Sequence, residues 1–163
     1  QNVFTLSCRI IYMNSKTVAS NKKARFDFFL EETFVAGLLL EGWEVKSLRE
    51  GKLNIKEAYI KDIKGELFLV GARIDPAHYI NQKELIEPGR FRKLLLNKRE
   101  VEKILFAISA KGQTCVPVKL FWKGHLAKLE IALAKGKKNI DKKQTKKIAD
   151  IERDQERALK NYK

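Results

Sequence analysis

The sequence predicts a mainly β protein: an antiparallel β domain with one well-marked helix, followed by a basic segment at the C-terminus. Two pairs of apolar runs each flank a Lys-Gly turn, at Lys64-Gly65 and at Lys123-Gly124, which predicts two β-hairpins. Between the hairpins, one segment carries apolar residues at helical spacing. From residue 135 onward, charged residues dominate and the core-forming residues stop.

The expected strands are short apolar runs bounded by turn residues. Gly37 indicates a bulge or bend within the second of them. The segment 43–50 has no clear period, and Gly51 closes it. Because the last two runs alternate only partly between apolar and polar residues, a curved or closed sheet is expected. In chain order, the expected strands are residues 25–30, 34–40, 57–62, 66–74, 114–122 and 126–134.

The helix is predicted over residues 97–110. Asn97 can cap its N-terminus, and Glu100 can accept a hydrogen bond from the backbone N–H of that cap. Gly112 suits the C-terminal stop. The segment 76–93 before the helix is expected to be a long loop. The apolar face of the helix is formed by Val101, Ile104, Leu105 and Ile108.

Composition divides the chain into a flexible N-terminal arm (residues 1–20), a β domain (21–134) and a basic tail (135–163). Three interpretations of the arm remain open: an upstream extension before an initiating Met13, a trimmed organelle-targeting segment, or an ordinary mobile basic arm. In the tail, apolar residues recur about every three or four positions, a stripe too thin for an isolated helix. The tail is therefore expected to fold on a partner.

The charge indicates a polyanionic partner. Lys and Arg number 34 against 20 Asp and Glu, a formal net charge of +14. Such a balance favours nucleic acid over an anionic membrane surface. The longest apolar run, residues 34–40, is far shorter than a membrane span, so we expect a soluble intracellular protein with no membrane partner.

Catalytic, cofactor and metal chemistry are not indicated. His78 and His125 lie in unlike contexts, and Cys8 and Cys115 form neither a CxxC metal site nor a disulfide framework. The chain has no HExxH, GxSxG, Walker or dinucleotide-binding motif. We therefore expect no enzyme activity, no cofactor and no metal.

Features suited to nucleic acid are clearer. Arg90-Phe-Arg-Lys93 combines three cations with an aromatic ring, and cations neutralise phosphates while a ring stacks on a base. The alternative is a core Phe91 with solvated cations. Gly136, which is surrounded by lysines, would let the backbone approach a phosphate closely; the alternative is that these lysines belong to a solvated tail. Trp43 and Trp122 are either stacking surfaces or buried residues.

Five blocks of the sequence together resemble the small protein B (SmpB) family, in the family's order and with similar separations. The likeness runs from about residue 21 to the C-terminus. It implies an antiparallel, closed, OB-fold-like β-barrel with flanking helices. The blocks are Asn21-Lys-Lys-Ala-Arg25, Ala36-Gly37, Gly42-Trp-Glu-Val-Lys-Ser-Leu-Arg49, Arg92-Lys-Leu-Leu-Leu-Asn97 and Ala134-Lys-Gly-Lys-Lys138.

The resemblance also implies a function. Proteins of this family bind the tRNA-like domain of transfer-messenger RNA (tmRNA) and deliver it to stalled ribosomes in trans-translation. Their tail, disordered when free and helical when bound, occupies the small-subunit decoding centre and the mRNA channel. A monomer in the bacterial cytoplasm is implied, or an organelle lumen if residues 1–20 are a trimmed targeting segment. The alternative function is an OB-type, non-specific single-stranded nucleic-acid-binding protein.

The same resemblance implies the site residues. We expect neutralisation of the three tail lysines around Gly136 to spare isolated RNA binding and to impair tagging on stalled ribosomes. The RNA-binding residues are Asn21, Lys22, Arg25, Lys46, Arg92, Lys93, Leu95 and Asn97, although Leu95 can equally be a core residue. The ribosome-binding tail residues are Lys135, Gly136, Lys137, Lys138, Asp141, Lys142 and Lys143.

Two positions depart from the family pattern. Val35 stands where the family usually has Glu, and Ile140 stands where well-studied members have His. Val35 can neither accept a hydrogen bond from a base nor hold an arginine. Ile140 cannot stack as an imidazole does, although it can pack against a base. These changes put the details of ribosome engagement, rather than RNA binding itself, in question.

Overall fold

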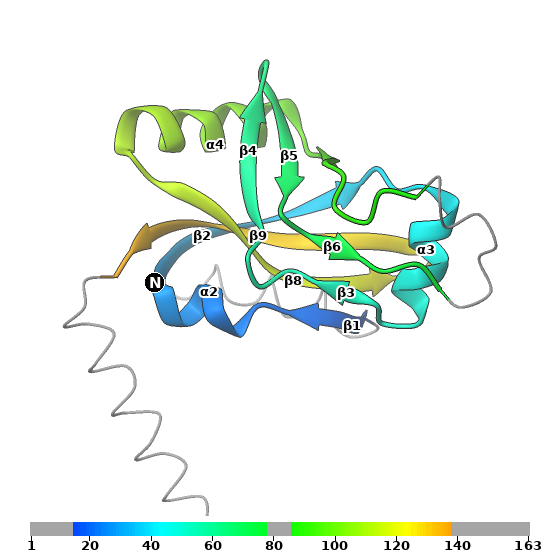
Figure 1. The fold of residues 1–163 in the computed structure, drawn as a ribbon. Coiled ribbons are helices and arrows are strands. Elements are labelled where there is room, and N and C mark those ends of the chain that lie inside the picture. Colours follow the sequence, from blue (N-terminus) through cyan, green and yellow to red (C-terminus); the bar gives the residue numbers. More distant parts are fainter. Residues whose placement is uncertain (1–14, 78–85, 138–163) are drawn as a thin grey trace, which may run out of the picture.

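A computed structural model describes residues 15–77 and 86–137 (Figure 1). The described elements, in chain order, are β1 (Ser15–Ser20), α2 (Lys22–Asp27), β2 (Phe28–Leu38), α3 (Gly42–Arg49), β3 (Leu53–Asn54), β4 (Tyr59–Ile63), β5 (Glu66–Val70), β6 (Arg73–Ile74), β7 (Arg92–Leu95), α4 (Lys98–Lys111), β8 (Thr114–Lys123) and β9 (Leu126–Gly136). The prediction of a mainly β, antiparallel protein with helices is confirmed.

Seven strands form one antiparallel sheet in the order β1-β8-β4-β5-β7-β2-β9, and β3 pairs separately with β6. Strand β9 pairs with β2 on one side and with β8 on the other, so the series of pairings returns to β8. Strand β1 lies outside this circuit, on the other edge of β8. The long strands β2, β8 and β9 run across the molecule, and the helices and the shorter strands lie around them (Figure 1).

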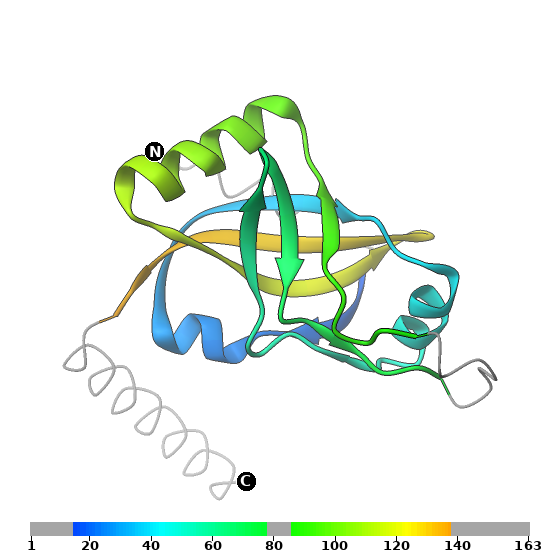
Figure 2. The same cartoon turned by 45° about the horizontal axis from the view of Figure 1, so that its top comes forward.

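One apolar core lies inside the sheet. Leu120 and Leu129, which are paired across β8 and β9, are almost completely buried. Ile104 and Ala107 of α4 and Leu48 of α3 belong to the same core. Figure 2 shows α4 lying across the ends of β4 and β5. The apolar face of α4, predicted from its spacing, thus covers the core.

Local sequence signals place the first hairpin and α4 as predicted. Lys64 and Gly65 both have positive φ angles, 54° and 80°, as a two-residue type I′ turn requires. Gly65 also donates its backbone N–H to Asp62 Oδ1 at 2.9 Å. At the start of α4, Glu100 accepts from the backbone N–H of Asn97 at 3.0 Å, and the helix ends at Gly112 in the left-handed conformation.

The strands predicted over residues 25–30 and 34–40 need correction. Residues Lys22–Asp27 form α2, because the Asn21 side chain accepts from the backbone N–H of Ala24 at 3.0 Å and starts a helix. The chain then runs from Phe28 as a single strand, β2, with an irregular register between Leu30 and Thr33. The two predicted strands are therefore one strand preceded by a helical turn.

Two further segments also differ from expectation. Residues 15–20, assigned to the flexible arm, form β1 along β8, so the sheet begins before the predicted boundary at residue 21. Only Val18 and Ala19 of this strand pack on the core, which leaves a weak apolar pattern. The aperiodic segment 43–50 lies almost wholly in α3. At the other boundary, β9 continues through Gly136, two residues into the predicted tail.

Cys115 is buried in β8, with 0% of its surface exposed. Burial raises the pKa of its thiol from 9.0 to about 12. The folded protein therefore holds this proton at pH values where the unfolded chain releases it. The resulting contribution to stability is complete below pH 9 and is lost progressively as the pH rises toward 12.

We expect Cys115 to resist alkylation by iodoacetamide at about pH 8 in native buffer and to react fully in concentrated guanidinium. The measurement is the alkylated fraction by mass spectrometry, in a Cys8→Ser background so that Cys115 is the only thiol. Rapid native labelling of Cys115 would contradict its buried position.

Candidate nucleic-acid interface

The structure separates the predicted RNA-binding residues into three places. Lys22 and Arg25 lie on α2, Lys46 lies on α3, and the residues of the Arg92–Asn97 block lie on β7 and at the start of α4. In both views α2 and α3 are at different ends of the sheet (Figures 1 and 2). Lys46 therefore lies apart from Lys22 and Arg25.

The first place is a basic cluster where α2 meets the end of β9. We call it the α2–β9 cluster, and its members are Lys22, Arg25, Lys135 and Lys137. Lys135 and Gly136 pair with the first residues of β2, directly after α2. Lys22, Arg25 and Lys135 are exposed. The structure thus joins a predicted RNA-binding segment to the predicted start of the ribosome-binding tail.

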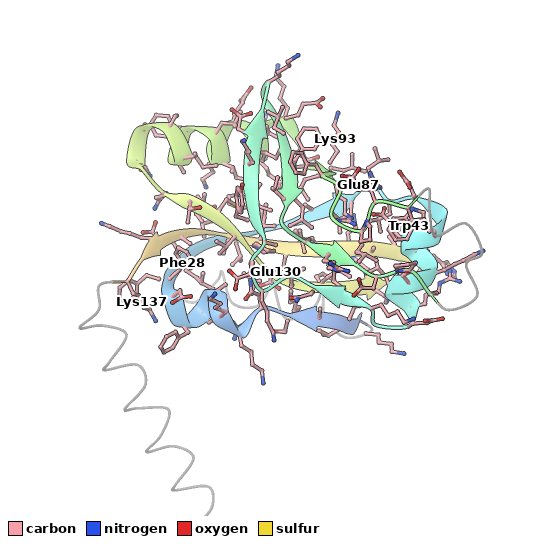
Figure 3. All side chains as sticks on the ribbon, in the orientation of Figure 1. Phe28, Trp43, Glu87, Lys93, Glu130 and Lys137 are labelled. Carbon is pink, nitrogen blue, oxygen red and sulfur yellow. The ribbon has the colours of Figure 1, made fainter. Side chains whose placement is uncertain are left out.

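Lys137 holds the end of β9 against α2. Its backbone N–H donates to the Asp27 carbonyl oxygen at 2.9 Å. Its Nζ donates to the Arg25 carbonyl oxygen at 3.1 Å and lies 5.0 Å from the centre of the Phe29 ring. A cation placed at the C-terminal end of a helix is favourable for the helix dipole. Figure 3 shows Lys137 beside α2, far from Lys93.

Asn21 is a positioning residue rather than an exposed contact. Its side chain is buried, with 2% of its surface exposed. The side-chain oxygen caps α2 through Ala24, and Nδ2 donates to the Ile55 carbonyl oxygen at 2.9 Å. The amide is thus used inside the protein, where it holds the start of α2 in place.

Arg92 is also not an exposed contact, which corrects the expectation for the Arg92–Asn97 block. Its side chain is 0% exposed and donates from Nε to Glu44 Oε1 at 2.7 Å. Its other donors reach the carbonyl oxygens of Ala72 and Pro88, both at 2.8 Å, and of Arg90 at 2.9 Å. The guanidinium therefore ties β7 to α3 and to the segment before β7.

The carboxylate of Glu44 is the centre of this buried network. Besides Arg92, it accepts from Arg90 Nε at 3.0 Å and from the backbone N–H of Glu41 at 2.8 Å. Burial lowers the pKa of Arg92, and the charge of Glu44 opposes that shift. A buried charge is tolerated only when it is paired and hydrogen-bonded in this way. This pairing could not be predicted from sequence patterns, because Glu44 and Arg92 are 48 residues apart along the chain.

The second place is a groove of about 610 Å³ along β7, which we call the β7 groove. It brings together Lys93, Leu95 and Asn97 of the predicted block, with Val35 and Lys128 from β2 and β9. Leu95 is 51% exposed, so it is a surface residue. Lys93 forms an ion pair with Glu66 at one side of the groove. An exposed apolar side chain in a groove that also contains cations suits contact with a base beside a phosphate.

Gly37 leaves room for Leu95 on the neighbouring strand. The two residues are paired across β2 and β7, and a Cβ atom on Gly37 would lie only 3.2 Å from the Leu95 Cβ. A side chain at position 37 would force Leu95 to shift by a few tenths of an ångström. The absence of a side chain at position 37 thus shapes the floor of the β7 groove.

Comparison with known proteins decides the family. A family model described as "SmpB protein" matches residues 18–161. The chain belongs to the SmpB family. An SsrA-binding protein of Pseudomonas putida is 49% identical over 145 residues, 89% of this chain and 91% of that protein. An SsrA-binding protein of Chromohalobacter salexigens is 47% identical over 150 residues, 92% of this chain and 96% of that protein.

A solved structure agrees with this SmpB assignment. A chain from "tmRNA-SmpB: a journey to the center of the bacterial ribosome" superposes with a TM-score of 0.62 at 38% sequence identity. The match covers 74% of this chain and 85% of that chain. The antiparallel, mainly β architecture is therefore shared with an SmpB structure.

Val35, the departure from the usual SmpB pattern, lies directly opposite Glu130 in the register of β2 and β9. Glu130 is half-buried and forms an ion pair with Lys119 at 3.8 Å. This SmpB protein thus carries a carboxylate on the strand next to position 35. An additional Glu at position 35 would face a like charge.

We expect Val35→Glu to lower the free energy of unfolding by about 0.2–1 kcal/mol, because like charges directly opposite each other in a sheet repel. Val35→Gln is the matched control, with the same shape and no charge. The measurement is urea unfolding of both variants, and Val35→Glu/Glu130→Gln is expected to recover the loss. Equal stabilities of the Glu and Gln variants would contradict the repulsion.

Several predicted residues of the SmpB tail lie outside the described residues. These are Lys138, Asp141, Lys142 and Lys143, together with the second departure, Ile140. No helix within residues 15–77 and 86–137 is long and apolar enough to cross a membrane. Those ranges also contain no group of three or more His, Cys, Asp or Glu side chains placed to hold a metal ion.

Proposed function

We propose that the protein binds the tRNA-like domain of tmRNA and delivers it to stalled ribosomes in trans-translation. The observation that carries this proposal is the match to the SmpB family over residues 18–161. Relatives named SsrA-binding proteins, which cover about nine-tenths of the chain, support the RNA partner. The tmRNA–SmpB structure of the bacterial ribosome supports the ribosome as the second partner. The bacterial relatives and the bacterial ribosome of that structure support a location in the bacterial cytoplasm.

The architecture suits this function as a closed, OB-fold-like barrel. The support is the circuit of pairings that leaves β8 through β4 and returns through β9, with α4 packed on the enclosed core. Barrels of this type bind nucleic acid on an outer face and in adjoining loops. The chain from residue 137 onward then forms the basic tail that occupies the decoding centre and the mRNA channel.

The candidate RNA contacts are the accessible members of the predicted set. In the α2–β9 cluster, Lys22 and Arg25 present two exposed cations to phosphates. In the β7 groove, Lys93 and Asn97 supply polar groups beside the exposed Leu95. Lys46 is an exposed cation on α3. Asn21 and Arg92 act through the elements that they hold in place.

The test is a comparison of affinities for the tRNA-like domain of tmRNA and for a single strand of equal length, across a salt series. A preference of at least tenfold for the folded RNA, about 1.4 kcal/mol, that persists as salt rises supports shape-specific recognition. Equal affinities that fall together by about 10³ or more between about 50 and 200 mM salt would identify a non-specific single-strand binder. That outcome would overturn the proposed function.

A further inference from the structure

Another cationic surface, which contains none of the predicted RNA-binding residues, lies at the end of the sheet away from α2. A hollow of about 600 Å³ opens between β1, the end of α3 and the β8–β9 turn. Its lining includes Lys16, Arg49, Trp122 and His125. Neither the proposed contacts on α2 nor those in the β7 groove belong to it. We call it the Trp122 hollow.

Strand register fixes the wall of the Trp122 hollow. Lys16 of β1 is paired directly with Trp122 of β8. Residues opposite each other in an antiparallel pair have Cβ atoms about 5 Å apart on the same face. Trp122 is half-buried and packs against the apolar core, so its indole is held in position while part of it faces the hollow.

The cations of the hollow are available to an external anion. Lys16 and Arg49 are exposed, and within the described part of the chain neither has an ion-pair partner. Glu50 also lines the hollow, but it is paired with Lys52 at 3.1 Å, which offsets its charge. His125, exposed in the turn, adds a ring that can donate or accept a hydrogen bond.

We propose that the Trp122 hollow takes one unpaired nucleotide of an RNA, with the base stacked on Trp122 and the phosphate held by Lys16 and Arg49. The inference rests on the proposed function only in taking RNA as the partner. A π surface beside two cations is the combination that binds an exposed nucleotide without reading its sequence. Stacking of this kind contributes strongly to affinity for unpaired bases, because every base has a π face.

The hollow is too far from the α2–β9 cluster for one nucleotide to fill both. Val116 of β8 packs on Ala24 of α2, and Trp122 lies six positions further along the same strand. At about 3.3 Å per residue, the separation is about 20 Å. The nucleotide therefore comes either from a second part of the tmRNA that binds α2 or from the RNA of the ribosomal small subunit.

Charge reversal tests the cations of the hollow. The variant is Lys16→Glu/Arg49→Glu, and the matched control is Lys61→Glu/Lys111→Glu, which changes two exposed cations elsewhere and gives the same net charge. Affinities are measured for the tRNA-like domain of tmRNA and for isolated small ribosomal subunits. If the affinity for the tRNA-like domain falls at least tenfold further than in the control, the nucleotide belongs to tmRNA. If the affinity for the small subunit falls by that much, the nucleotide belongs to ribosomal RNA. Losses equal to those of the control for both would overturn the proposal.

Fluorescence gives a direct reading of the stacking. In a Trp43→Phe background, Trp122 is the only tryptophan, and we expect RNA to quench its emission. If the tRNA-like domain and the small subunit both bind and neither of them quenches Trp122, the proposal is also overturned. If the wild-type protein binds tmRNA no better than an unrelated folded RNA of equal length, the proposed function fails. Quenching by that unrelated RNA would still decide whether the hollow takes a nucleotide.

Discussion

Replacing Arg92 with alanine is expected to lower the free energy of unfolding by about 3–5 kcal/mol, because the change leaves Glu44 as an undercompensated buried charge. Both side chains are 0% exposed, and their 2.7 Å contact joins β7 to α3. The change also removes the donors to the carbonyl oxygens of Ala72 and Pro88. The measurement is the midpoint of urea unfolding at about pH 7, with the slope checked for two-state behaviour.

Two controls separate burial from charge. Lys93→Ala removes an ion pair with Glu66, in which both side chains are partly exposed, and is expected to cost less than about 1 kcal/mol. Arg92→Lys keeps the charge but lacks the planar guanidinium that reaches several acceptors. We therefore expect its loss of unfolding free energy to lie between those of Lys93→Ala and Arg92→Ala. If Arg92→Ala folds with wild-type stability and instead loses RNA affinity, Arg92 is an RNA contact after all and the structural role is wrong.

The elements that the sequence predicted well are those controlled by local chemistry. The turn at Lys64-Gly65 needs two positive φ angles, and the end of α4 needs one at Gly112. Both requirements involve only neighbouring residues, so the local sequence is enough to predict them. The apolar face of α4 is equally local, because it repeats within a single helix.

Helix α3 escaped prediction because its buried face is largely polar. Glu44, Ser47 and Leu48 are the buried residues of this helix, at the spacing of one helical face. A search for apolar periodicity does not detect a face on which two of the three buried side chains are a carboxylate and a hydroxyl. The partner that makes Glu44 tolerable, Arg92, lies 48 residues away in the sequence.

The same reasoning explains why two of the candidate RNA-binding residues, Asn21 and Arg92, are buried. Arg92 and Lys93 are adjacent cations in the sequence, but they point to opposite sides of β7, one into the buried network and one into the groove. Asn21 and Lys22 are likewise adjacent polar residues in the sequence, but the Asn21 amide is buried and Lys22 is exposed. Charge and polarity identify candidate RNA contacts, and only tertiary structure separates the exposed ones from those that hold the fold.

Reversing the charges of Lys22 and Arg25 is expected to lower the affinity for the tRNA-like domain of tmRNA by about 10- to 100-fold. Both cations are exposed on α2, and each phosphate contact that is lost should also reduce the slope of log affinity against log salt by about 1. The measurement is a salt series for Lys22→Glu/Arg25→Glu, with the Lys61→Glu/Lys111→Glu protein as the matched control. A slope equal to that of the control would exclude α2 as a phosphate-binding element.

The α2–β9 cluster also allows a test of the separate roles proposed for the barrel, which binds tmRNA, and for the tail, which binds the ribosome. Lys137 holds the Arg25 carbonyl oxygen, so the tail starts against the helix that carries Lys22 and Arg25. Neutralising Lys135, Lys137 and Lys138 to alanine is expected to leave the affinity for isolated tmRNA within about threefold, because the two exposed cations of α2 remain. The same variant should fail to tag stalled ribosomes. If its RNA affinity instead falls as far as that of the α2 variant, the cluster is one continuous RNA surface, and the tail begins only after residue 138.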